Sequence, residues 1–154
     1  MRILLPVDGS EYSNKAVGEV VRRPWPAGTQ VEVLSVAQPV PEFPDTQLMG
    51  HTVYLDSLER ETKRAQKNVA ETAATIAQAA PQLAVTTKVL EGTPKEEILR
   101  EATAWDADLI VMGSHGYGAA MRFLMGSISH AVALHAPCSV EIVRPRKTAQ
   151  PAKS

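Results

Sequence analysis

The sequence contains very little cysteine and no long run of apolar residues. Cys138 is the single cysteine, so the chain cannot form an internal disulfide, which is typical of proteins in a reducing compartment. No stretch of the sequence approaches the roughly 18 apolar residues of a membrane-spanning helix. Only five residues separate Arg2 from Asp8, too few for the apolar region of a signal peptide. We therefore expect a cytoplasmic protein with no membrane segment.

The chain also lacks an excess of charge of either sign. Its 16 Lys and Arg residues stand against 17 Asp and Glu residues, which gives a formal net charge of -1. Such a chain does not attract a polyanion as a whole, so we expect neither nucleic acid nor a membrane surface as a partner. A length of 154 residues with 44% apolar content fits one folded domain. We expect this domain to cover residues 1–145, followed by a disordered tail at 146–154 that has no large apolar residue.

Apolar runs and helical periodicities alternate along the chain. Helices are predicted from Glu11 to before Pro24 and at residues 55–80, 94–105 and 119–135, the last interrupted by Gly126-Ser127. Prolines in segment 38–52 predict an irregular loop there. Because a helix lies in each connection between strands, we predict an α/β fold: a three-layer, doubly wound, five-stranded parallel sheet. The predicted strands are residues 2–8, 30–37, 83–90, 107–112 and 139–144.

Two of the predicted helices begin with recognisable capping residues. Ser10 is placed to accept a hydrogen bond from the first turn of the first helix. The segment Thr93-Pro94-Lys95-Glu96 has the spacing of a capping box, with Pro at the first helical position. Both sequences predict that the helix begins at a defined residue, immediately after a strand or turn.

Three segments that follow predicted strands are candidates for a ligand site. In a doubly wound sheet, ligands bind outside the carboxyl ends of the strands, near the point where the strand order reverses. Asp8 ends the first strand, Val36 lies at the end of the second, and a glycine-rich loop starting at Gly113 ends the fourth. The sequence therefore predicts that these segments meet at one edge of the sheet.

The glycine-rich loop has the spacing Gly113-x2-Gly116-x9-Gly126-Ser127. Gly113 and Gly116 allow backbone N–H groups to approach an anion without obstruction by a Cβ atom, and they tolerate positive φ. Gly126 interrupts a helical pattern at a cost of about 1 kcal/mol relative to Ala. We expect it to restart a helix capped by Ser127 or Ser129, whose N-terminus forms a second phosphate-binding position. Two such positions suit a di- or triphosphate.

These motifs resemble those of the universal stress protein family. The glycine motif is followed by residues 128–143, Ile-Ser-His-Ala-Val-Ala-Leu-His-Ala-Pro-Cys-Ser-Val-Glu-Ile-Val, and the opening segment 3–10 is Ile-Leu-Leu-Pro-Val-Asp-Gly-Ser. The resemblance covers nearly the whole chain, from Met1 to about Pro145. It implies five parallel strands in the order 3-2-1-4-5, a homodimer, and binding of ATP by members that keep the glycine motif.

The resemblance also implies roles for individual residues. Asp8 would contact the ribose or a metal-bound phosphate, which makes it the metal-contacting residue for Mg²⁺, and Val36 would meet the adenine edge through its backbone. His115 stands where Arg is frequent in relatives, so its phosphate contact would be weaker and pH-dependent. The residues expected to hold ATP are Pro6, Val7, Asp8, Val36, Met112, Gly113, Ser114, His115, Gly116, Gly126, Ser127 and Ile128.

Several of these features have simpler interpretations. Asp8 could cap only the first helix, and the glycines could be tight turns. His130 and His135 are five positions apart on a helix and do not share a face, which disfavours a metal pair. Cys138 is interpreted as a small buried apolar residue, and the charges at 59–64 as a solvated helix face.

Three functional hypotheses follow. The first is an ATP-binding stress-response regulator that signals through the loop at 38–52. The second is a slow ATPase or an adenylyl-transfer enzyme, although Asp8-Gly9-Ser10-Glu11 lacks the His that nucleotidylyl transferases carry after their first strand. The third is an interaction module with a dispensable nucleotide site, which dimerises through an exposed edge strand at 139–144.

Overall fold

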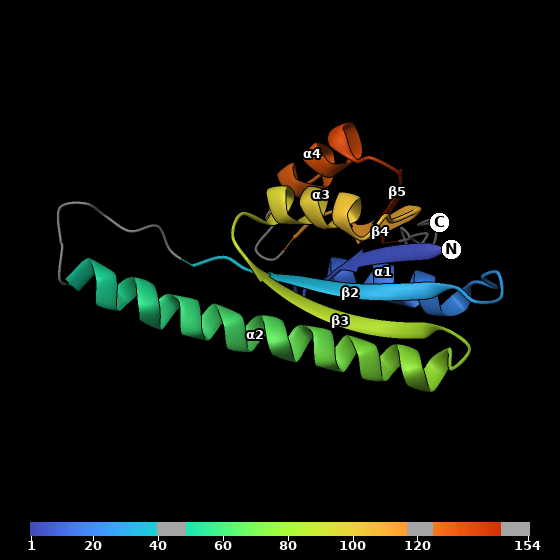
Figure 1. Ribbon diagram of the computed structural model, residues 1–154, viewed down its shortest axis with the longest axis horizontal. Coiled ribbons are helices and arrows are strands. Elements are labelled where there is room, and N and C mark those ends of the chain that lie inside the picture. Colours follow the sequence, from blue (N-terminus) through green and yellow to red (C-terminus); the bar gives the residue numbers. More distant parts are fainter. Residues whose placement is uncertain (40–48, 117–124, 146–154) are drawn as a thin grey trace, which may run out of the picture.

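A computed structural model describes residues 1–39, 49–116 and 125–145, and it contains a five-stranded sheet of parallel strands (Figure 1). The strands lie in the order β3-β2-β1-β4-β5, as expected. They are β1 (Arg2–Pro6), β2 (Gln30–Ala37), β3 (Ala84–Glu91), β4 (Leu109–Gly113) and β5 (Ser139–Val143). The predicted fold class and strand order are confirmed, and the predicted strand ends differ from the observed ones by at most two residues.

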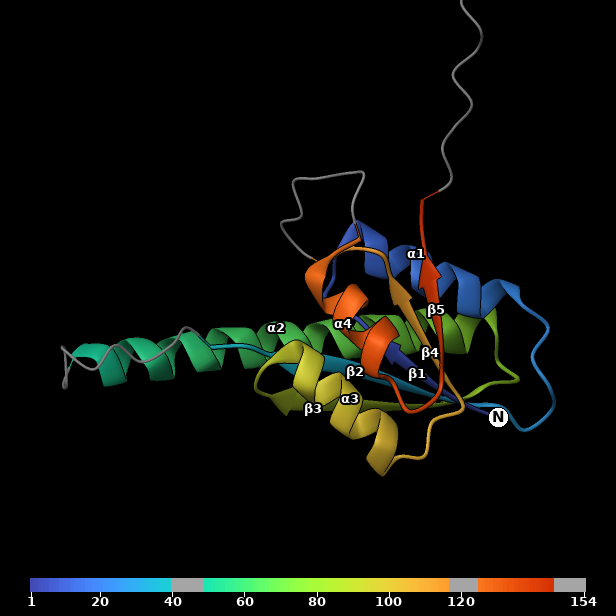
Figure 2. The ribbon, with the colours of Figure 1, turned by 90° about the horizontal axis from the view of Figure 1, so that it is seen from above.

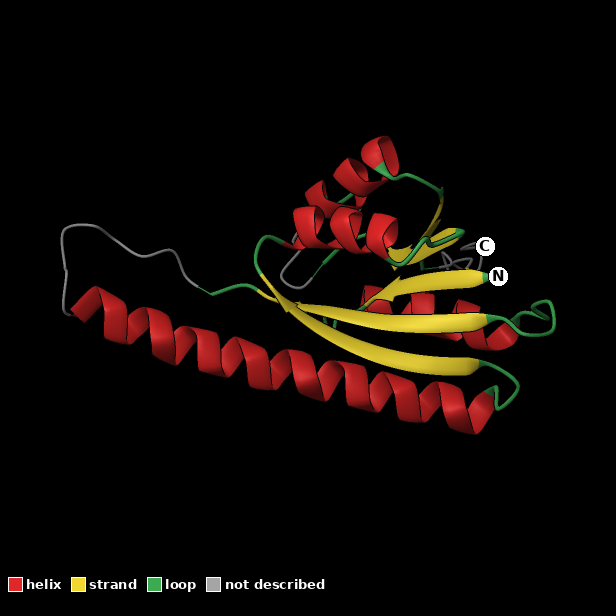
Figure 3. Ribbon diagram, in the orientation of Figure 1, coloured by secondary structure: helices red, strands yellow, loops and turns green. Residues whose placement is uncertain are grey.

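Four helices cover the two faces of the sheet in the described part of the chain. α1 and α2 lie against one face, while α3 and α4 lie against the other (Figures 1 and 2). In Figure 3 the strands form a single twisted layer between the two helical layers. The helices are α1 (Glu11–Arg22), α2 (Met49–Ala79), α3 (Pro94–Ala104) and α4 (Ser127–His135).

β1 lies at the centre of the sheet and is buried on both faces. It pairs with β2 from Arg2↔Gln30 to Pro6↔Leu34, and with β4 on its other side. Successive side chains of a strand point to opposite faces, so one apolar run contributes to two cores. Ile3 and Leu5 join the core under α1 and α2, and Leu4 joins the core under α3 and α4.

The start of α1 follows the predicted capping pattern, but the start of α3 does not. The Ser10 Oγ atom accepts a hydrogen bond from the Ser13 N–H at 3.1 Å. The Thr93 side chain makes no capping hydrogen bond, so the predicted capping box is wrong. Instead the Thr93 carbonyl accepts the N–H groups of Glu96 and Glu97, each at 3.0 Å, and closes the first turn through the backbone.

α2 begins earlier than predicted. The sequence predicted an irregular loop over 38–52 and a helix from residue 55, whereas α2 starts at Met49 and runs for 31 residues. The loop was predicted from prolines that end at Pro44 and from Gly50, but a single glycine lowers helix propensity without breaking a helix, and α2 includes it. The first turns of α2 extend past the carboxyl ends of the strands (Figure 1).

Three predicted segments lie wholly or mostly outside the described residues. These are the loop at 38–52, of which residues 40–48 are not described, most of the helical segment that precedes Gly126, and the tail at 146–154. Among the residues that the structure describes, no helix is both long enough and apolar enough to cross a membrane.

Candidate functional site

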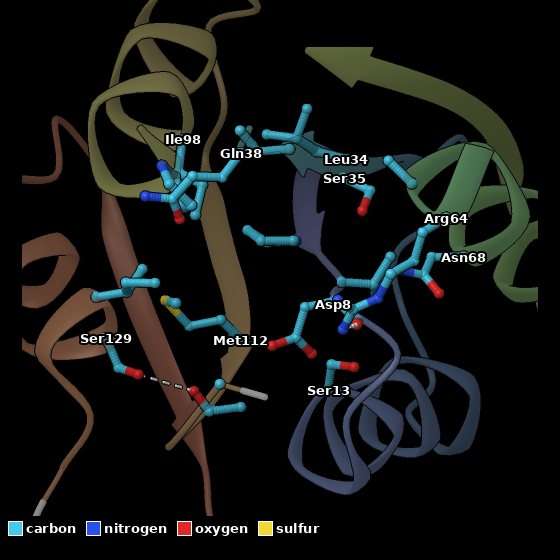
Figure 4. A pocket seen from close by; sticks show the side chains of 18 of the residues that line it. Asp8, Ser13, Leu34, Ser35, Gln38, Arg64, Asn68, Ile98, Met112 and Ser129 are labelled. Atoms are coloured by element: carbon cyan, nitrogen blue, oxygen red, sulfur yellow. Dashed lines mark hydrogen bonds between the residues drawn. The ribbon is translucent and has the colours of Figure 1, made fainter. Parts of the chain in front are cut away.

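A cavity of about 370 Å³ lies at the carboxyl ends of β1, β2 and β4 (Figure 4). Its volume is in the range of small-molecule sites, roughly 300–1,000 Å³. Besides the residues that follow these strands, α2, α3 and α4 each contribute side chains to its wall. The position agrees with the general rule for doubly wound sheets, in which ligands bind where the strand order reverses. Here that reversal lies between β1 and β4.

Most of the predicted site residues meet at this cavity, and three do not. Ser114, Gly126 and Ser127 do not line it. Ser114 is instead 2% exposed and ties the glycine loop to the sheet, because its N–H donates to the Val143 carbonyl at 3.0 Å. The predicted residues that line the cavity are Pro6, Val7, Asp8, Val36, Met112, Gly113, His115, Gly116 and Ile128.

The Asp8 carboxylate stabilises the turn after β1 and also lines the cavity. Its Oδ1 atom accepts the Ser10 N–H at 2.9 Å, which holds the turn between β1 and α1. Its Oδ2 atom lies 3.2 Å from the point where a Cβ atom of Gly116 would be. In Figure 4 this carboxylate points into the cavity between Met112 and Arg64. Because Ser10 provides the side-chain cap of α1, Asp8 is not restricted to capping that helix.

The glycines of the motif are required for close packing and not for positive φ. The glycines with positive φ in the described residues are Gly9, Gly28 and Gly92, so Gly113 and Gly116 do not use their tolerance of that region here. A Cβ atom on Gly113 would lie 2.5 Å from the Tyr12 carbonyl carbon of α1. Gly113 therefore lets β4 approach α1, while Gly116 leaves space beside Asp8.

The first turn of α4 reaches the cavity through Ile128 and Ser129, without the predicted side-chain cap. Gly126 is the N-cap residue and no side chain caps the helix, so the expected roles of Ser127 and Ser129 are wrong. The Ser129 Oγ atom instead donates to the Gly113 carbonyl at 3.1 Å, which ties α4 to the loop after β4. The Gly126 N–H donates to the Ser114 carbonyl at 2.8 Å. These bonds fix the helix N-terminus, which favours negative charge, at the edge of the site.

His115 is held in a defined orientation beside the cavity. Its Nδ1 atom lies 3.0 Å from the Ser114 Oγ atom, and its ring centroid lies 4.8 Å from that of Tyr12. The Nε2 atom is buried and has no hydrogen-bond partner in the described part of the structure. The ring is therefore positioned by contacts on two sides.

Sequence reasoning missed the contribution of α2. Glu61, Arg64, Ala65 and Asn68 all line the cavity, so the interpretation of residues 59–64 as only a solvated face is wrong for Glu61 and Arg64. Ala65 is 2% exposed and anchors this face against the sheet. The four residues have the spacing i, i+3, i+4 and i+7 of one helix face, which is the signal that could have found them. Other lining residues not predicted are Ser13, Leu34, Ser35, Gln38, Pro94, Ile98 and Ser129.

The cavity wall combines an apolar side with charged groups. Leu34, Val36 and Ile98 contribute apolar surface from β2 and α3, whereas Asp8 and Arg64 lie on the side of β1 and α2 (Figure 4). Such a wall fits a ligand with a flat apolar part and a polar or charged part. The fold and the site together define a doubly wound α/β protein with a small-molecule cavity at its topological switch point.

The chain belongs to the universal stress protein family. The family profile, described as "Universal stress protein family", matches residues 1–144. A universal stress protein from Thermus aquaticus is 34% identical over 142 residues, which cover 92% of this chain and 97% of that relative. The solved structure of the universal stress protein UspA from Lactobacillus plantarum is 27% identical, with a TM-score of 0.78 and coverage of 94% of this chain and 97% of that one.

Two more distant structures of the same fold were solved with nucleotides. A universal stress protein family member from Arabidopsis thaliana with AMP bound is 15% identical, with a TM-score of 0.64 and coverage of 99% of this chain and 96% of that one. A universal stress protein in complex with cAMP is 20% identical, with a TM-score of 0.60 and coverage of 95% of this chain and 98% of that one. At these identities the likeness shows the shared fold.

Proposed function

We propose that this protein binds an adenine nucleotide in the cavity and acts as a stress-response regulator, with ATP and Mg²⁺ as its ligands. The observation that carries the proposal is the meeting of Asp8, Val36, Gly116 and the first turn of α4 at one cavity. The AMP and cAMP bound to two proteins of this fold support the same ligand class. A cytoplasmic location, expected from the single cysteine, is part of this proposal.

The two sides of the cavity suit the two ends of a nucleotide. A purine base has flat apolar faces that match Val36 and Ile98, and its edge can bond to the backbone of β2 at Val36. The phosphates carry negative charge, which the N-terminus of α4 and the backbone N–H groups of the glycine loop stabilise. Gly116 places no side chain beside the Asp8 carboxylate, which lines the cavity.

The residues present fit a Mg²⁺ ion that is shared with the ligand. Mg²⁺ prefers oxygen ligands and is usually held by one or two carboxylates together with substrate phosphates. Asp8 supplies such a carboxylate at the cavity. Within the described residues, no group of three or more His, Cys, Asp or Glu side chains could hold a metal ion. In the proposed complex, Mg²⁺ would supply positive charge to the phosphates, and Asp8 would hold it.

An enzyme on the same scaffold is the second candidate. The Asp8 carboxylate points into the cavity and could orient a water molecule toward a bound phosphate, which would give slow ATP hydrolysis. A turnover of about 1 s⁻¹ or more that Asp8→Asn abolishes would favour the enzyme over the regulator. Binding without such turnover would favour the regulator.

Direct binding measurements test the proposal. Isothermal titration of wild type with ATP and Mg²⁺ should give saturable binding, and Gly116→Val and Gly126→Val should weaken it at least about tenfold. A Cβ atom at Gly126 would lie 3.2 Å from the His115 Cα atom, so this substitution moves the loop. Gly18→Ala on α1 is the matched control, because nothing lies within 4 Å of its added Cβ atom. Equal affinity of all four proteins would contradict the proposal.

A further inference from the structure

Arg64 reaches the cavity from a helix outside the glycine motif. In Figure 4 its side chain extends from α2 to the side of Asp8. Its Nη2 atom lies 3.4 Å from the Asp8 carbonyl oxygen, and its Nη1 atom lies 3.7 Å from the Glu61 Oε2 atom. The neighbouring Ala65 and Val69 are 2% and 5% exposed, so the backbone that carries Arg64 is firmly packed against the sheet.

The charges in the cavity wall indicate that Arg64 affects the binding of a negatively charged ligand. Among the described lining residues, Asp8 and Glu61 carry carboxylates, and Arg64 is the only Lys or Arg. Two carboxylates repel a phosphate that enters the cavity, and an arginine between them offsets that repulsion. The Arg64 side chain is 41% exposed, so a ligand can approach its guanidinium group.

The chemistry of a guanidinium group matches a phosphate. Arginine presents five N–H donors in a planar fork that binds phosphate oxygens in pairs. With five donors, Arg64 can bind a phosphate and keep its contact with the Asp8 carbonyl. The backbone N–H groups of the glycine loop are uncharged, so Arg64 adds a full positive charge that they do not supply.

We propose that Arg64 contacts a phosphoryl group of the bound nucleotide and selects nucleotides over nucleosides. This inference rests on the proposed function, because it names the group that the same site recognises. In this proposal α2 is part of the binding surface. Its Arg64 contributes a positive charge to phosphate binding in addition to the backbone N–H groups of the glycine motif. Arg64 is thus a specificity-determining residue.

A purely structural role of Arg64 makes a different prediction. If the guanidinium only positioned the Asp8 turn, its loss would weaken every ligand that uses Asp8, with or without a phosphate. If it contacts the phosphoryl group, its loss weakens AMP and leaves adenosine unchanged. The comparison of these two ligands therefore separates the two roles.

The experiment measures dissociation constants for adenosine, AMP and ATP in wild type, Arg64→Met and Arg64→Lys. Arg64→Met should bind AMP about tenfold more weakly, a loss at the lower end for hydrogen bonds to a charged group because Arg64 is partly exposed. Its affinity for adenosine should stay within about twofold of wild type. Arg64→Lys should recover part of the loss, since it keeps the charge and loses the planar fork.

Lys67→Met is the matched control. Lys67 lies three residues further along α2, has a side chain that is 72% exposed, and does not line the cavity. This variant removes the same charge from the same helix, so its AMP affinity should remain within about twofold of wild type. Melting temperatures of all variants show whether the fold is intact.

The possible results distinguish failure of the Arg64 proposal from failure of the proposed function. Equal weakening of adenosine and AMP in Arg64→Met, or unchanged AMP affinity, would overturn the role of Arg64 while leaving nucleotide binding established. An equal loss in Lys67→Met would show that the effect is long-range charge, which also overturns a direct contact. Wild type that binds none of the three ligands would overturn the proposed function itself, and the inference with it.

Discussion

The Asp8 carboxylate lies directly against the backbone of Gly116, with Oδ2 3.2 Å from the position that a Cβ atom would take. This distance is shorter than an ordinary van der Waals contact, so any side chain at position 116 must displace the carboxylate. The two residues are far apart in the sequence and come from the ends of neighbouring strands. The absence of a side chain at Gly116 therefore lets the glycine loop lie close to the turn after β1.

A double-mutant cycle measures this contact. Gly116→Ala should destabilise the wild-type protein by about 1 kcal/mol, the lower end of overpacking costs, because the added methyl group displaces only the end of the Asp8 side chain. In an Asp8→Ala background the same substitution should cost less, because the carboxylate is gone. Urea unfolding of the four proteins gives the interaction free energy. Identical costs in the two backgrounds would show that the residues do not interact.

Gly113→Ala is expected to damage the fold and not only the site. Its Cβ atom would lie 2.5 Å and 2.6 Å from the Tyr12 carbonyl carbon and oxygen, and backbone atoms cannot turn away as side chains do. Overpacking of this kind costs typically 1–3 kcal/mol, and the short distance here predicts the upper end, about 3 kcal/mol. Thermal unfolding compared with Gly18→Ala tests the prediction, and unchanged stability would contradict it.

Glu32 should make the stability of the protein fall as the pH rises toward neutrality. It is 7% exposed on β2, and burial together with the neighbouring Glu101 carboxyl raises the pKa of Glu32 to about 7, partly offset by Lys88. The folded state therefore binds more protons than the unfolded state between the ordinary value of about 4.5 and about 7. Stability contributed by neutral Glu32 is present below this range and lost as the pH rises through it.

Glu32→Gln removes this dependence, because glutamine stays neutral. Relative to wild type, the variant should gain free energy of unfolding from pH 4.5 to 7 and then level off, at no more than about 3 kcal/mol. Denaturant unfolding at several pH values measures the difference. Glu59→Gln is the contrasting control, because Lys63 lowers the pKa of the exposed Glu59. A difference between Glu32→Gln and wild type that is constant with pH would refute the prediction.

An ion pair joins α1 to the edge strand β5. Two nitrogens of Arg23 lie 2.5 Å and 2.6 Å from the carboxylate oxygens of Glu141, and this bond raises the pKa of Arg23. The two side chains are 36% and 26% exposed, so water and salt weaken the pair. Glu141→Gln should cost roughly 1 kcal/mol at low salt and less at 1 M NaCl. A cost that does not change with salt would exclude the electrostatic explanation.

The edge position of β5 supports the predicted homodimer. β5 pairs only with β4, and no other described strand pairs with its outer edge, where a second copy of the chain could add a strand. Light scattering should give the mass of two chains at micromolar concentration. A mass equal to the 16.6 kDa of one chain would refute the prediction.

The elements were largely predictable, because each depends on local patterns. The apolar run at 2–8 and the alternation at 30–37 reflect burial on one or two faces of a sheet, which a pattern of residue types records directly. The start of α2 was mispredicted, since a proline-rich segment and the helix after it have no sharp boundary in the sequence. The cap of α3 was mispredicted because the Thr93 carbonyl replaced its hydroxyl, a choice between two acceptors of the same residue.

The sequence by itself determined the alternation of strands and helices, and with it which strand ends carry Asp8, Val36 and the glycine loop. Parallel strands place those ends at one edge, so the location of the cavity followed from connectivity alone. Only the tertiary structure decided that Arg64 faces the cavity and that Gly113 packs against Tyr12. Contacts between segments far apart in the chain depend on distances of a few ångströms, and such distances leave no periodic signal in the residues themselves.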